Sequence, residues 1–425
     1  MSNRIVLVGA VSSSFGYKTI QDAINAPTLK GSNLVLHDID SEKLALMTRC
    51  AQNLNLSMGE PLRIQSTTDR EVALAGADFV IVCIDVDRIR RWRLDWEIPF
   101  RYGVKQVLGE NGGPGGLFHT LRMVPPMLEI AHDMERLCGD ALMLSYTNPI
   151  PQLSLAVSRY SNVKIVGLCH EVEHQLQRLA RIIGVPMMLL EATSAGLNHF
   201  SWFKKLQLKD DSDAYPLLDD GLKDAKEFQP LCRAIYRKFG LYPSTDDNHI
   251  GEYFAYAWEV CAPDLRGEEW IRKQEQESEV IRRKVLSVAL DEENSDKIPS
   301  GEAAIRIISG IVSNSGHTEV QVNMPNRGQI PGILAKAVVE SPAKIDRKGV
   351  HPVNVGELPK GISALLNIQI LIQNLSVEAA VHGDRKKAIQ ALLADPVVQD
   401  STSVDKVFNE LFNAHRDLLP QFKED

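Results

Sequence analysis

A cysteine and a histidine about thirty residues apart are the first side chains in this sequence that could do chemistry. Cys169 directly follows the apolar stretch at residues 163–168, and His199 ends the run GLNH at residues 196–199. Each alone is usually structural, since a lone cysteine packs as a small hydrophobe and a lone histidine is a satisfied polar residue. On two loops at one edge of a sheet, a thiolate and an imidazole could instead hold one divalent metal ion. Their spacing leaves both interpretations open.

Titratable side chains gather further along the chain, at residues 242–256. These 15 residues contain three tyrosines together with Asp246, Asp247, His249 and Glu252. Either aspartate could cap the N-terminus of a helix, since its carboxylate accepts the free N–H groups of the first turn. Such a density of ionisable groups is nevertheless what proton transfer needs. This segment is therefore a candidate acid–base site.

Glycine dominates residues 109–116, which read GENGGPGG. This composition predicts neither a helix nor a strand, because ordering glycine costs more backbone entropy than ordering any other residue. A bare linker is one interpretation, but the apolar stretches at residues 104–108 and 117–123 are unusual beside a linker. Close approach of the backbone to a ligand explains the glycines better. Glu110 is then a candidate general acid.

A third loop has the position of a dinucleotide-binding turn. It follows the first apolar stretch and contains Gly9, Ala10, Val11, Ser12, Ser13, Ser14, Phe15 and Gly16. The usual glycine pattern is degraded, because its second glycine is Val11 here, but serine hydroxyls and backbone amides can still bind phosphate. Asp38 ends the next apolar stretch, where an acid that binds ribose belongs. An ordinary strand-to-helix loop is the alternative, and the placement favours NAD-type binding.

These loops require a sheet whose strands end at a common edge. Apolar stretches fall at residues 4–11, 33–38, 77–85, 141–147 and 163–168, with a shorter strand-like one at 64–67. Uninterrupted apolar strands separated by helices predict a Rossmann-like, doubly wound α/β fold with a parallel sheet, as in lactate and malate dehydrogenases. We expect an NAD-binding domain at residues 1–190. An α+β, helix-rich domain at residues 191–425, helical at 268–290 and over most of 358–393, would serve metal, substrate and oligomer contacts.

The composition argues against several classes of partner. The 425 residues carry 47 Lys and Arg against 55 Asp and Glu, a net charge of −8, whereas nucleic-acid binding needs a basic face. The longest apolar runs fall well short of the ~20 residues of a membrane span, and no secretion signal is recognisable. The six cysteines are scattered, which indicates reduced thiols and a cytoplasmic protein. Residues 291–300 are expected to form a mobile loop.

In their order along the chain, these motifs resemble the NAD- and manganese-dependent glycosidases of glycoside hydrolase family 4. The resemblance covers nearly the whole chain, and the order and spacing of its elements make it specific. The matching elements are Ile98-Pro99, Tyr102-Gly103, the glycine loop, Thr147-Asn148-Pro149, Cys169-His170, residues 196–199, Asp247-Asn248-His249, residues 325–328, Val338-Val339-Glu340, and residues 356–359 and 379–385.

The resemblance implies roles for most of the candidate residues. The ligands of manganese would be Cys169 and His199. The residues in contact with the sugar would be Asn148, His170, Glu171 and Asn198. The groups that move protons would be Glu110 on the leaving oxygen, Asp247 as an acid–base residue, and Tyr253, or else Tyr256, as the base at C2. NAD would lie on the turn at residues 9–15 and on Asp38.

The resemblance also suggests a substrate. Within the family, the residues after the metal-binding cysteine differ with the sugar, and the run CHEV at residues 169–172 resembles that of α-galacturonidases. The implied partner is an α-galacturonide or short oligogalacturonide, bound by a homodimer or homotetramer. The uronate carboxylate needs a cation, for which the candidates are Arg90, Arg91, Arg122 and Arg327. Glu171 would repel that carboxylate, so it is expected to accept a hydrogen bond from a sugar hydroxyl instead.

The implied reaction explains why these groups occur together. A carboxylate at C6 disfavours the oxocarbenium-like transition state of direct cleavage. Hydride transfer from C3 to NAD makes the C2 hydrogen acidic, and a metal ion on the C2 and C3 oxygens stabilises the enolate. The C1 group then leaves with a proton from Glu110, water adds, and NADH reduces the ketone again.

Three alternatives stay open. The first is another family 4 α-glycosidase, namely an α-glucuronidase, α-glucosidase or α-galactosidase. The second is a 2-hydroxy-acid dehydrogenase, which would accumulate NADH and gives no reason for the pair Cys169 and His199. The third is a non-catalytic NAD-binding or sugar-sensing protein, which would bind ligands and cleave no glycoside.

Overall fold

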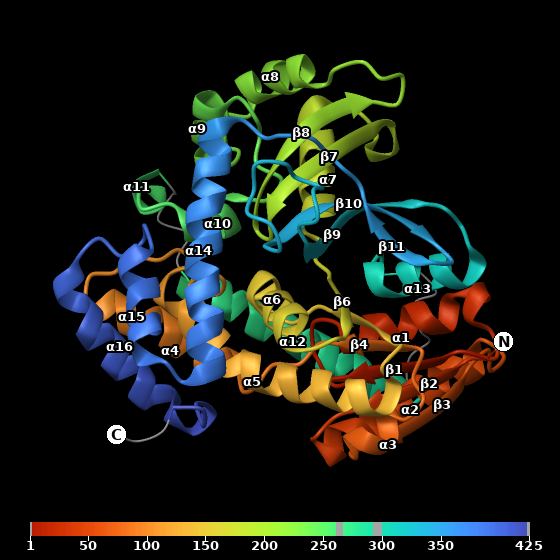
Figure 1. Cartoon of the computed structure of the whole chain (residues 1–425). Coiled ribbons are helices and arrows are strands. Elements are labelled where there is room, and N and C mark those ends of the chain that lie inside the picture. The colour runs from red at the N-terminus through yellow and green to blue at the C-terminus, as the bar shows by residue number, and fades with distance from the viewer. Residues whose placement is uncertain (1, 261–266, 292–299, 423–425) are drawn as a thin grey trace.

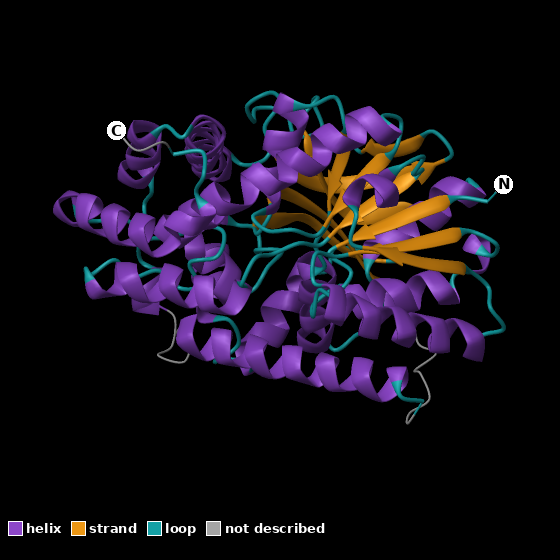
Figure 2. Cartoon of the chain, turned by 90° about the horizontal axis from the view of Figure 1, so that it is seen from below, coloured by secondary structure: helices purple, strands orange, loops and turns teal. Residues whose placement is uncertain are grey.

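The computed structural model describes residues 2–260, 267–291 and 300–422, and its strands form one 11-stranded sheet (Figure 1). Six parallel strands make one half, in the spatial order β3-β2-β1-β4-β5-β6. Their bounds are β1 (Arg4–Val8), β2 (Asn33–His37), β3 (Arg63–Thr67), β4 (Phe79–Val82), β5 (Leu142–Ser145) and β6 (Lys164–Gly167). The predicted Rossmann-like sheet is confirmed, and its strands end at a common edge (Figure 2).

Antiparallel strands continue the same sheet beyond β6 in the order β9-β10-β7-β8, and β11 pairs with β10. Their bounds are β7 (Leu190–Leu197), β8 (Phe200–Leu208), β9 (Thr318–Pro325), β10 (Val338–Asp346) and β11 (Gly349–Pro352). A pairing of Gly167 with Asn323 joins the two halves. The sheet is thus continuous across residue 190, and the domain boundary expected there stays a prediction.

Helices cover both faces of the parallel half because alternate strand residues point to opposite sides. Ile5 and Leu7 of β1 pack with α1 (Gly16–Asn25), α2 (Ser41–Ser57), α12 (Gly267–Ala289) and α13 (Ala303–Ser313). Val6 and Val8 pack on the other side with α3 (Arg70–Leu74), α5 (Gly113–Cys138) and α6 (Ile150–Tyr160). The inner strands are therefore largely apolar, as the sequence indicated, whereas the edge strand β3 is mostly exposed.

The antiparallel strands have a separate hydrophobic cluster. The helices around it include α4 (Arg88–Arg101), α7 (Glu171–Ile183), α8 (Tyr215–Asp224), α9 (Pro230–Phe239), α10 (Asp247–Ile250) and α11 (Ala257–Val260). The chain closes with α14 (Lys360–His382), α15 (Arg385–Ala394) and α16 (Ser401–His415). The long helices expected at residues 268–290 and 358–393 are confirmed by α12, α14 and α15.

The glycine-rich segment corrects one expectation. Residues 113–116 form the first turn of α5, so the prediction that this segment contains no helix is wrong. Pro114 fits there because the first turn leaves its N–H groups unbonded in any case. A Cβ on Gly115 or Gly116 would collide with the backbone of Gly109 or Asn111. The glycines therefore let the loop fold against itself, and this self-packing accounts for them without close approach of a ligand.

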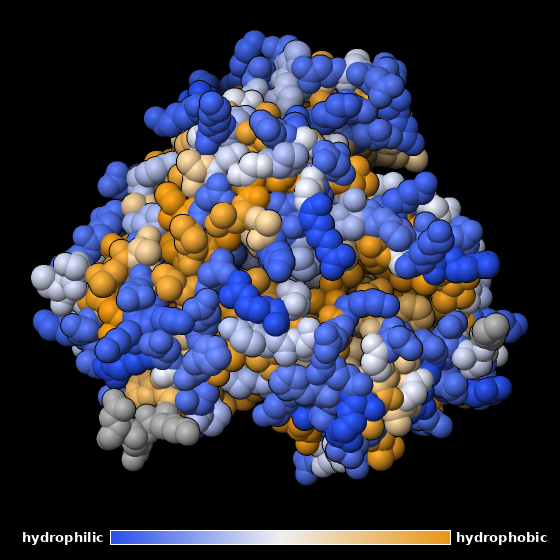
Figure 3. Space-filling model, in the orientation of Figure 1, coloured by the Kyte–Doolittle hydropathy of each residue, from blue (hydrophilic) through white to orange (hydrophobic). Residues whose placement is uncertain are grey.

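Helix α14 is the one described helix long and apolar enough to cross a membrane by length and composition alone. Half of its apolar window is buried in the protein, where it packs against α5, α6 and α15, as a core helix does. Its remaining face is apolar as well, with Ile368 and Leu371 exposed. Figure 3 shows apolar side chains gathered where α14 runs in Figure 1.

The cysteines of the described residues are all free thiols, as the scattered spacing indicated. Cys50, Cys83, Cys138 and Cys232 are buried, and only Cys169 of this set is partly exposed. Cys261 and residues 292–299, most of the loop expected to be mobile, lie outside the described residues.

Candidate active site

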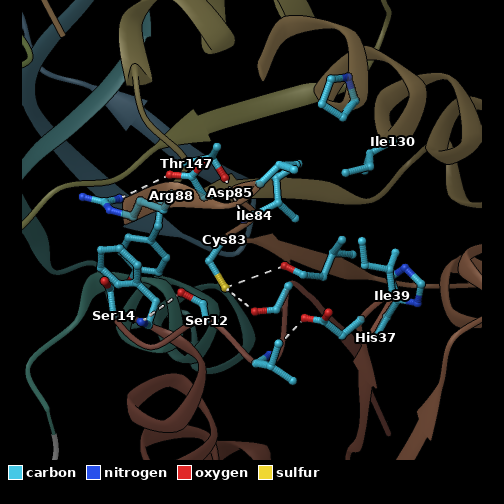
Figure 4. A pocket seen from close by; sticks show the side chains of 18 of the residues that line it. Ser12, Ser14, His37, Ile39, Cys83, Ile84, Asp85, Arg88, Ile130 and Thr147 are labelled. Atoms are coloured by element: carbon cyan, nitrogen blue, oxygen red, sulfur yellow. Dashed lines mark hydrogen bonds and ion pairs between the residues drawn. The ribbon is translucent and has the colours of Figure 1, made fainter. Parts of the chain in front are cut away.

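A cavity of about 320 Å³ opens at the carboxyl ends of β1, β4 and β5 (Figure 4). Of the residues predicted to hold a dinucleotide, those that line it are Gly9, Val11, Ser12, Ser13, Ser14, Phe15 and Asp38. Ala10 is buried in the core and does not line the cavity. In Figure 4, Ser12 and Ser14 lie on one side, with Arg88 and Thr147 on the other.

The dinucleotide turn is shaped by its first glycine and by the acid of β2. Gly9 has φ +84°, and a Cβ there would meet the carbonyl of Cys83. The carboxylate of Asp38 accepts the N–H of Val11 at 3.1 Å, so this amide holds the acid. The ring of Phe15 stacks on Tyr146 with centroids 4.3 Å apart. The hydroxyl groups of Ser12, Ser13 and Ser14 supply polar groups to the cavity at the turn where the second glycine of the usual pattern is missing.

The two proposed metal ligands do not line this cavity, but the ring of His170, next to Cys169, lies 6.1 Å from the ring of Phe15 in its lining. Cys169 follows β6 and His199 follows β7, and Sγ lies 3.2 Å from Nε2. Burial and, after it, the neighbouring charge of His249 hold the pKa of His199 well below its usual value, so its imidazole is neutral. Burial and the charge of Glu340 raise the pKa of the Cys169 thiol, so a cation is needed to stabilise its thiolate. A neutral imidazole and a thiol that ionises when a cation is present are together a suitable pair of metal ligands.

Two asparagines that follow strands, Asn148 after β5 and Asn198 after β7, present side-chain oxygen atoms without partners among the described residues. Asn148 donates through Nδ2 to Glu110 at 3.3 Å, and Asn198 donates through Nδ2 to Glu340 at 2.9 Å. The Oδ1 atoms of both, and Nδ1 of His199, are buried without a hydrogen-bond partner among the described residues. Since buried polar atoms are normally paired, these three atoms indicate space for a polar ligand or ion.

The candidate acid Glu110 is held by charged and polar neighbours. Nη2 of Arg88 donates to its Oε1 at 2.7 Å, a charge-assisted bond. Glu252 accepts the backbone N–H groups of Glu110 at 2.6 Å and Asn111 at 3.0 Å. Burial and the charge of Glu110 raise the pKa of Glu252 to about 7. Arg88, which was not predicted from the sequence, and Glu252, from the candidate acid–base segment, therefore fix the loop that carries Glu110.

The two adjacent aspartates have different surroundings. Asp247 accepts the backbone N–H groups of Leu231 at 3.0 Å and Cys232 at 2.8 Å, so its carboxylate is engaged by the start of α9. Asp246 lies 2.9 Å from Nδ1 of His249. Burial alone would raise the pKa of Asp246, but His249 and Arg178 hold it below its usual range. Burial lowers the pKa of His249, but the charge of Asp246 outweighs burial and raises the pKa of His249 to about 10. Asp246 and His249 therefore form an ion pair.

The tyrosines considered as bases differ in burial. Tyr253 is buried, its ring stacks on Phe200 at 4.6 Å, and its hydroxyl donates to the carbonyl of Asn198 at 3.4 Å. Burial and then the charge of Glu252 raise the pKa of Tyr253 well above its usual value. Tyr256 is half-buried and packs on Phe254 at 5.1 Å. Tyr253 is therefore bonded to the loop that carries the proposed ligand His199, and Tyr256 has no such contact among the described residues.

The residues after Cys169 contact other side chains. Glu171 accepts from Nη1 of Arg178 at 2.5 Å and from the N–H of Asp246 at 3.3 Å. Nδ1 of His170 lies 3.2 Å from Glu302, and its ring is 6.1 Å from that of Phe15. The motif therefore connects the dinucleotide turn to the acid–base segment.

The arginines considered for a substrate carboxylate do not line the cavity. Arg91 is paired with Asp417 at 2.5 Å, and Arg122 with the buried Asp95 at 2.6 Å. Arg90 is exposed beside Asp87, and Arg327 lies exposed on the loop after β9. Arg88 does line it. Its place in the first turn of the helix after β4 is a sequence signal that could have pointed to it.

Comparisons with known proteins agree with this arrangement. The family model described as "Family 4 glycosyl hydrolase" matches residues 4–185, and the one described as "Family 4 glycosyl hydrolase C-terminal domain" matches residues 194–398. The chain is 35% identical to an alpha-glucosidase of Erwinia rhapontici, with 100% of both chains covered. It is 32% identical to an alpha-galactosidase of Bacillus subtilis, covering 99% of this chain and 100% of the relative. An alpha-galacturonidase of Thermoanaerobacter italicus is 28% identical, with 98% and 97% covered.

Solved structures are similar along the same length. A 6-phospho-alpha-glucosidase from gut microorganisms, in complex with NAD and Mn²⁺, superimposes with a TM-score of 0.85 at 20% identity and covers 100% of both chains. Malate dehydrogenase of Plasmodium falciparum has a TM-score of 0.51 at 16% identity, covering 92% of this chain and 100% of its own. At these identities the likeness concerns the fold, and it confirms the dehydrogenase-like architecture.

Proposed function

The chain belongs to the family 4 glycosyl hydrolases, and we propose that it hydrolyses α-D-galacturonides with NAD and Mn²⁺ as cofactors. One observation carries the chemistry: Sγ of Cys169 lies 3.2 Å from Nε2 of His199. Buried side-chain atoms of Asn148, Asn198 and His199 lack hydrogen-bond partners among the described residues. This donor set fits a divalent ion and a sugar, although a thiolate is softer than the oxygen donors that manganese prefers.

The cofactors would lie in neighbouring sites. The turn at residues 9–15 and Asp38 would hold NAD, and Cys169 with His199 would hold the metal ion. When bound, they supply a hydride acceptor for C3 of the sugar and a Lewis acid for its oxygens. The chain's own residues orient the sugar through the free Oδ1 atoms of Asn148 and Asn198.

Proton transfer would fall to groups around the metal pair. Glu110, fixed by Arg88 and by Glu252 beneath its backbone, is placed beside Asn148 to give or take a proton at the leaving oxygen. The pair of Asp246 and His249 lies against His199, with imidazole centroids 4.4 Å apart. Tyr253 stays the candidate base at C2.

The substrate proposal rests on the CHEV run at residues 169–172, together with alpha-galacturonidases among the relatives. A second candidate is an α-glucoside, favoured by the 35% identity to the alpha-glucosidase of Erwinia rhapontici. It is favoured also because the four arginines considered for a uronate do not line the cavity. We further propose a cytoplasmic protein that assembles into a homodimer or homotetramer, for which the exposed apolar face of α14 offers a contact.

A substrate panel tests this proposal. Nitrophenyl α-galacturonide, α-glucuronide, α-glucoside and α-galactoside are each incubated with the protein, Mn²⁺, NAD and a thiol reductant. We expect release of nitrophenol from the galacturonide alone, without net NADH. Cleavage of the glucoside alone supports the second candidate. Accumulation of NADH without glycoside cleavage contradicts a glycosidase and indicates a dehydrogenase.

A further inference from the structure

The two proposed metal ligands come from strands that are not neighbours. Cys169 follows β6 and His199 follows β7, and in the sheet β9 and β10 lie between these strands. Sγ and Nε2 nevertheless lie 3.2 Å apart. The separation of the two ligands therefore depends on how the ends of four strands are tied together.

A relay of side chains on β9 and β10 makes that connection. Glu340 of β10 accepts from Nδ2 of Asn198 at 2.9 Å, next to the ligand His199. Asn323 of β9 has its Nδ2 at 3.4 Å from the same Oε2 of Glu340, and also at 3.4 Å from the carbonyl of Gly167 on β6. The relay thus runs from the strand that precedes Cys169 to the loop that carries His199.

Glu340 is a buried carboxylate with neutral partners. Its side chain is 1% exposed, and its other oxygen accepts from Ser201 at 2.8 Å, which is bonded to Ser244. Within the described residues, no lysine, arginine or histidine forms an ion pair with it. Burying a carboxylate without a counter-charge is unfavourable. By contrast, Glu319, which is 2% exposed, is paired with Arg306 at 2.6 Å.

We infer that Glu340 is the positioning residue of the metal pair. Through Asn198 and Asn323 it sets the separation of Cys169 and His199, and its charge favours a divalent cation beside them. The free Oδ1 of Asn198 is a consequence of the same bond, since its Nδ2 is held by Glu340. Outer carboxylates that orient ligands in this way raise metal affinity. The inference rests on the proposed metal dependence of this site.

Manganese affinity of the full-length protein tests it, measured by titration of the free Mn²⁺ paramagnetic resonance signal. Glu340→Gln removes the charge and keeps the shape, and we expect a dissociation constant about 10- to 100-fold higher than in the wild type. The matched control Glu319→Gln removes an equally buried carboxylate and should leave the constant unchanged. Ser201→Ala removes one hydrogen bond to Glu340 without changing its charge, and should stay close to the wild type.

Two further readouts separate positioning from a general loss of structure. The affinity for NAD, followed by protein fluorescence, should be the same in Glu340→Gln and the wild type. With Co²⁺ as the probe, the thiolate-to-cobalt absorption should weaken in Glu340→Gln and persist in Glu319→Gln. If Glu340→Gln does not fold, Asn323→Ala breaks the relay at the next residue, and it must weaken Mn²⁺ binding.

The outcomes are distinguishable. If Glu340→Gln binds Mn²⁺ as tightly as the wild type, the role of Glu340 is overturned and the proposed function stands. The same conclusion follows from wild-type affinity in Asn323→Ala if that variant has to be used. Failure of the wild-type protein to bind Mn²⁺ overturns both the inference and the metal-dependent function on which it rests.

Discussion

Nδ1 of His249 lies 2.9 Å from Oδ1 of Asp246, and the same imidazole lies against His199, with ring centroids 4.4 Å apart. The adjacent Asp247 instead accepts two backbone N–H groups at the start of α9. Two neighbouring carboxylates thus have different partners: Asp246 pairs with His249 and caps α10 by accepting the N–H groups of Asn248 and His249, whereas Asp247 binds the start of α9.

Asparagine substitutions at the two positions should have opposite effects. Asp246→Asn removes the counter-charge of His249, and we expect kcat/KM to fall by about 10² to 10⁴, the usual contribution of an acid–base group. Asp247→Asn should keep activity and lower the free energy of unfolding by about 1 kcal/mol, since one helix-capping acceptor is weakened. Steady-state kinetics and thermal unfolding check both. An inactive, stable Asp247→Asn would instead assign the acid–base role to Asp247.

The contact between Arg88 and Glu110 gives a second prediction. Arg88→Met leaves Glu110 with the weaker amide bond from Asn148, so the carboxylate is no longer fixed, and kcat/KM should fall about 10²-fold. Arg90→Met is the matched control, because Arg90 makes only an exposed pair with Asp87, and such pairs contribute little. Equal activities of the two variants would show that Arg88 does not act on Glu110.

The acid at the end of β2 should govern cofactor affinity. Asp38→Ala removes the acceptor of the Val11 N–H and the expected partner of the ribose, and the dissociation constant of NAD should rise about 10- to 100-fold. Asp40→Ala, two residues away, removes the cap of α2 and should lower the melting temperature without changing NAD binding. Calorimetric titration with NAD compares them. Unchanged NAD affinity in Asp38→Ala would place the cofactor elsewhere.

Glu252 should make stability depend on pH. Its pKa is raised to about 7 in the folded protein, so the folded state binds a proton that the unfolded state releases near pH 4.5. Stability from this group is therefore lost as pH rises from about 4.5 to 7, by up to roughly 3 kcal/mol. Glu252→Gln cannot ionise, so its melting temperature relative to the wild type should rise between pH 5 and pH 8. A difference that does not change with pH would contradict the shifted pKa.

The fold could be predicted because it follows from local patterns. Uninterrupted apolar stretches such as residues 79–82 form strands buried on both faces, and parallel strands bring the loops that follow them to one edge. Cys169 and His199 each follow a strand, but β7 is antiparallel to its neighbours, so the sequence left a common site as one of two interpretations. Their 3.2 Å separation could not be predicted, because the contacts of Asn323 and Glu340 between the strand ends join residues far apart in the chain.

The remaining parts of the site depend on contacts that local patterns do not encode. Glu252 accepts a hydrogen bond from the backbone N–H of Glu110, 142 residues away in the chain. Glu340 accepts one from the side chain of Asn198, also 142 residues away. Asp246 and Asp247 differ by one position, which rotates a side chain by about 100° at a helix start, and composition cannot choose between them. Gly115 and Gly116 let the loop pack on itself and Gly112 lets it approach the backbone of Glu252, and these contacts are visible only in the folded chain.

Exchange of the sugar's C2 hydrogen tests the central claim most directly. Turnover of the cleaved α-glycoside in heavy water, with Mn²⁺, NAD and a thiol reductant present, is followed by magnetic resonance of the released sugar. An enzyme that oxidises C3 and removes the C2 proton incorporates deuterium at C2, with no net NADH. Release of a sugar that carries only its original hydrogen at C2 would contradict the elimination chemistry proposed for this site.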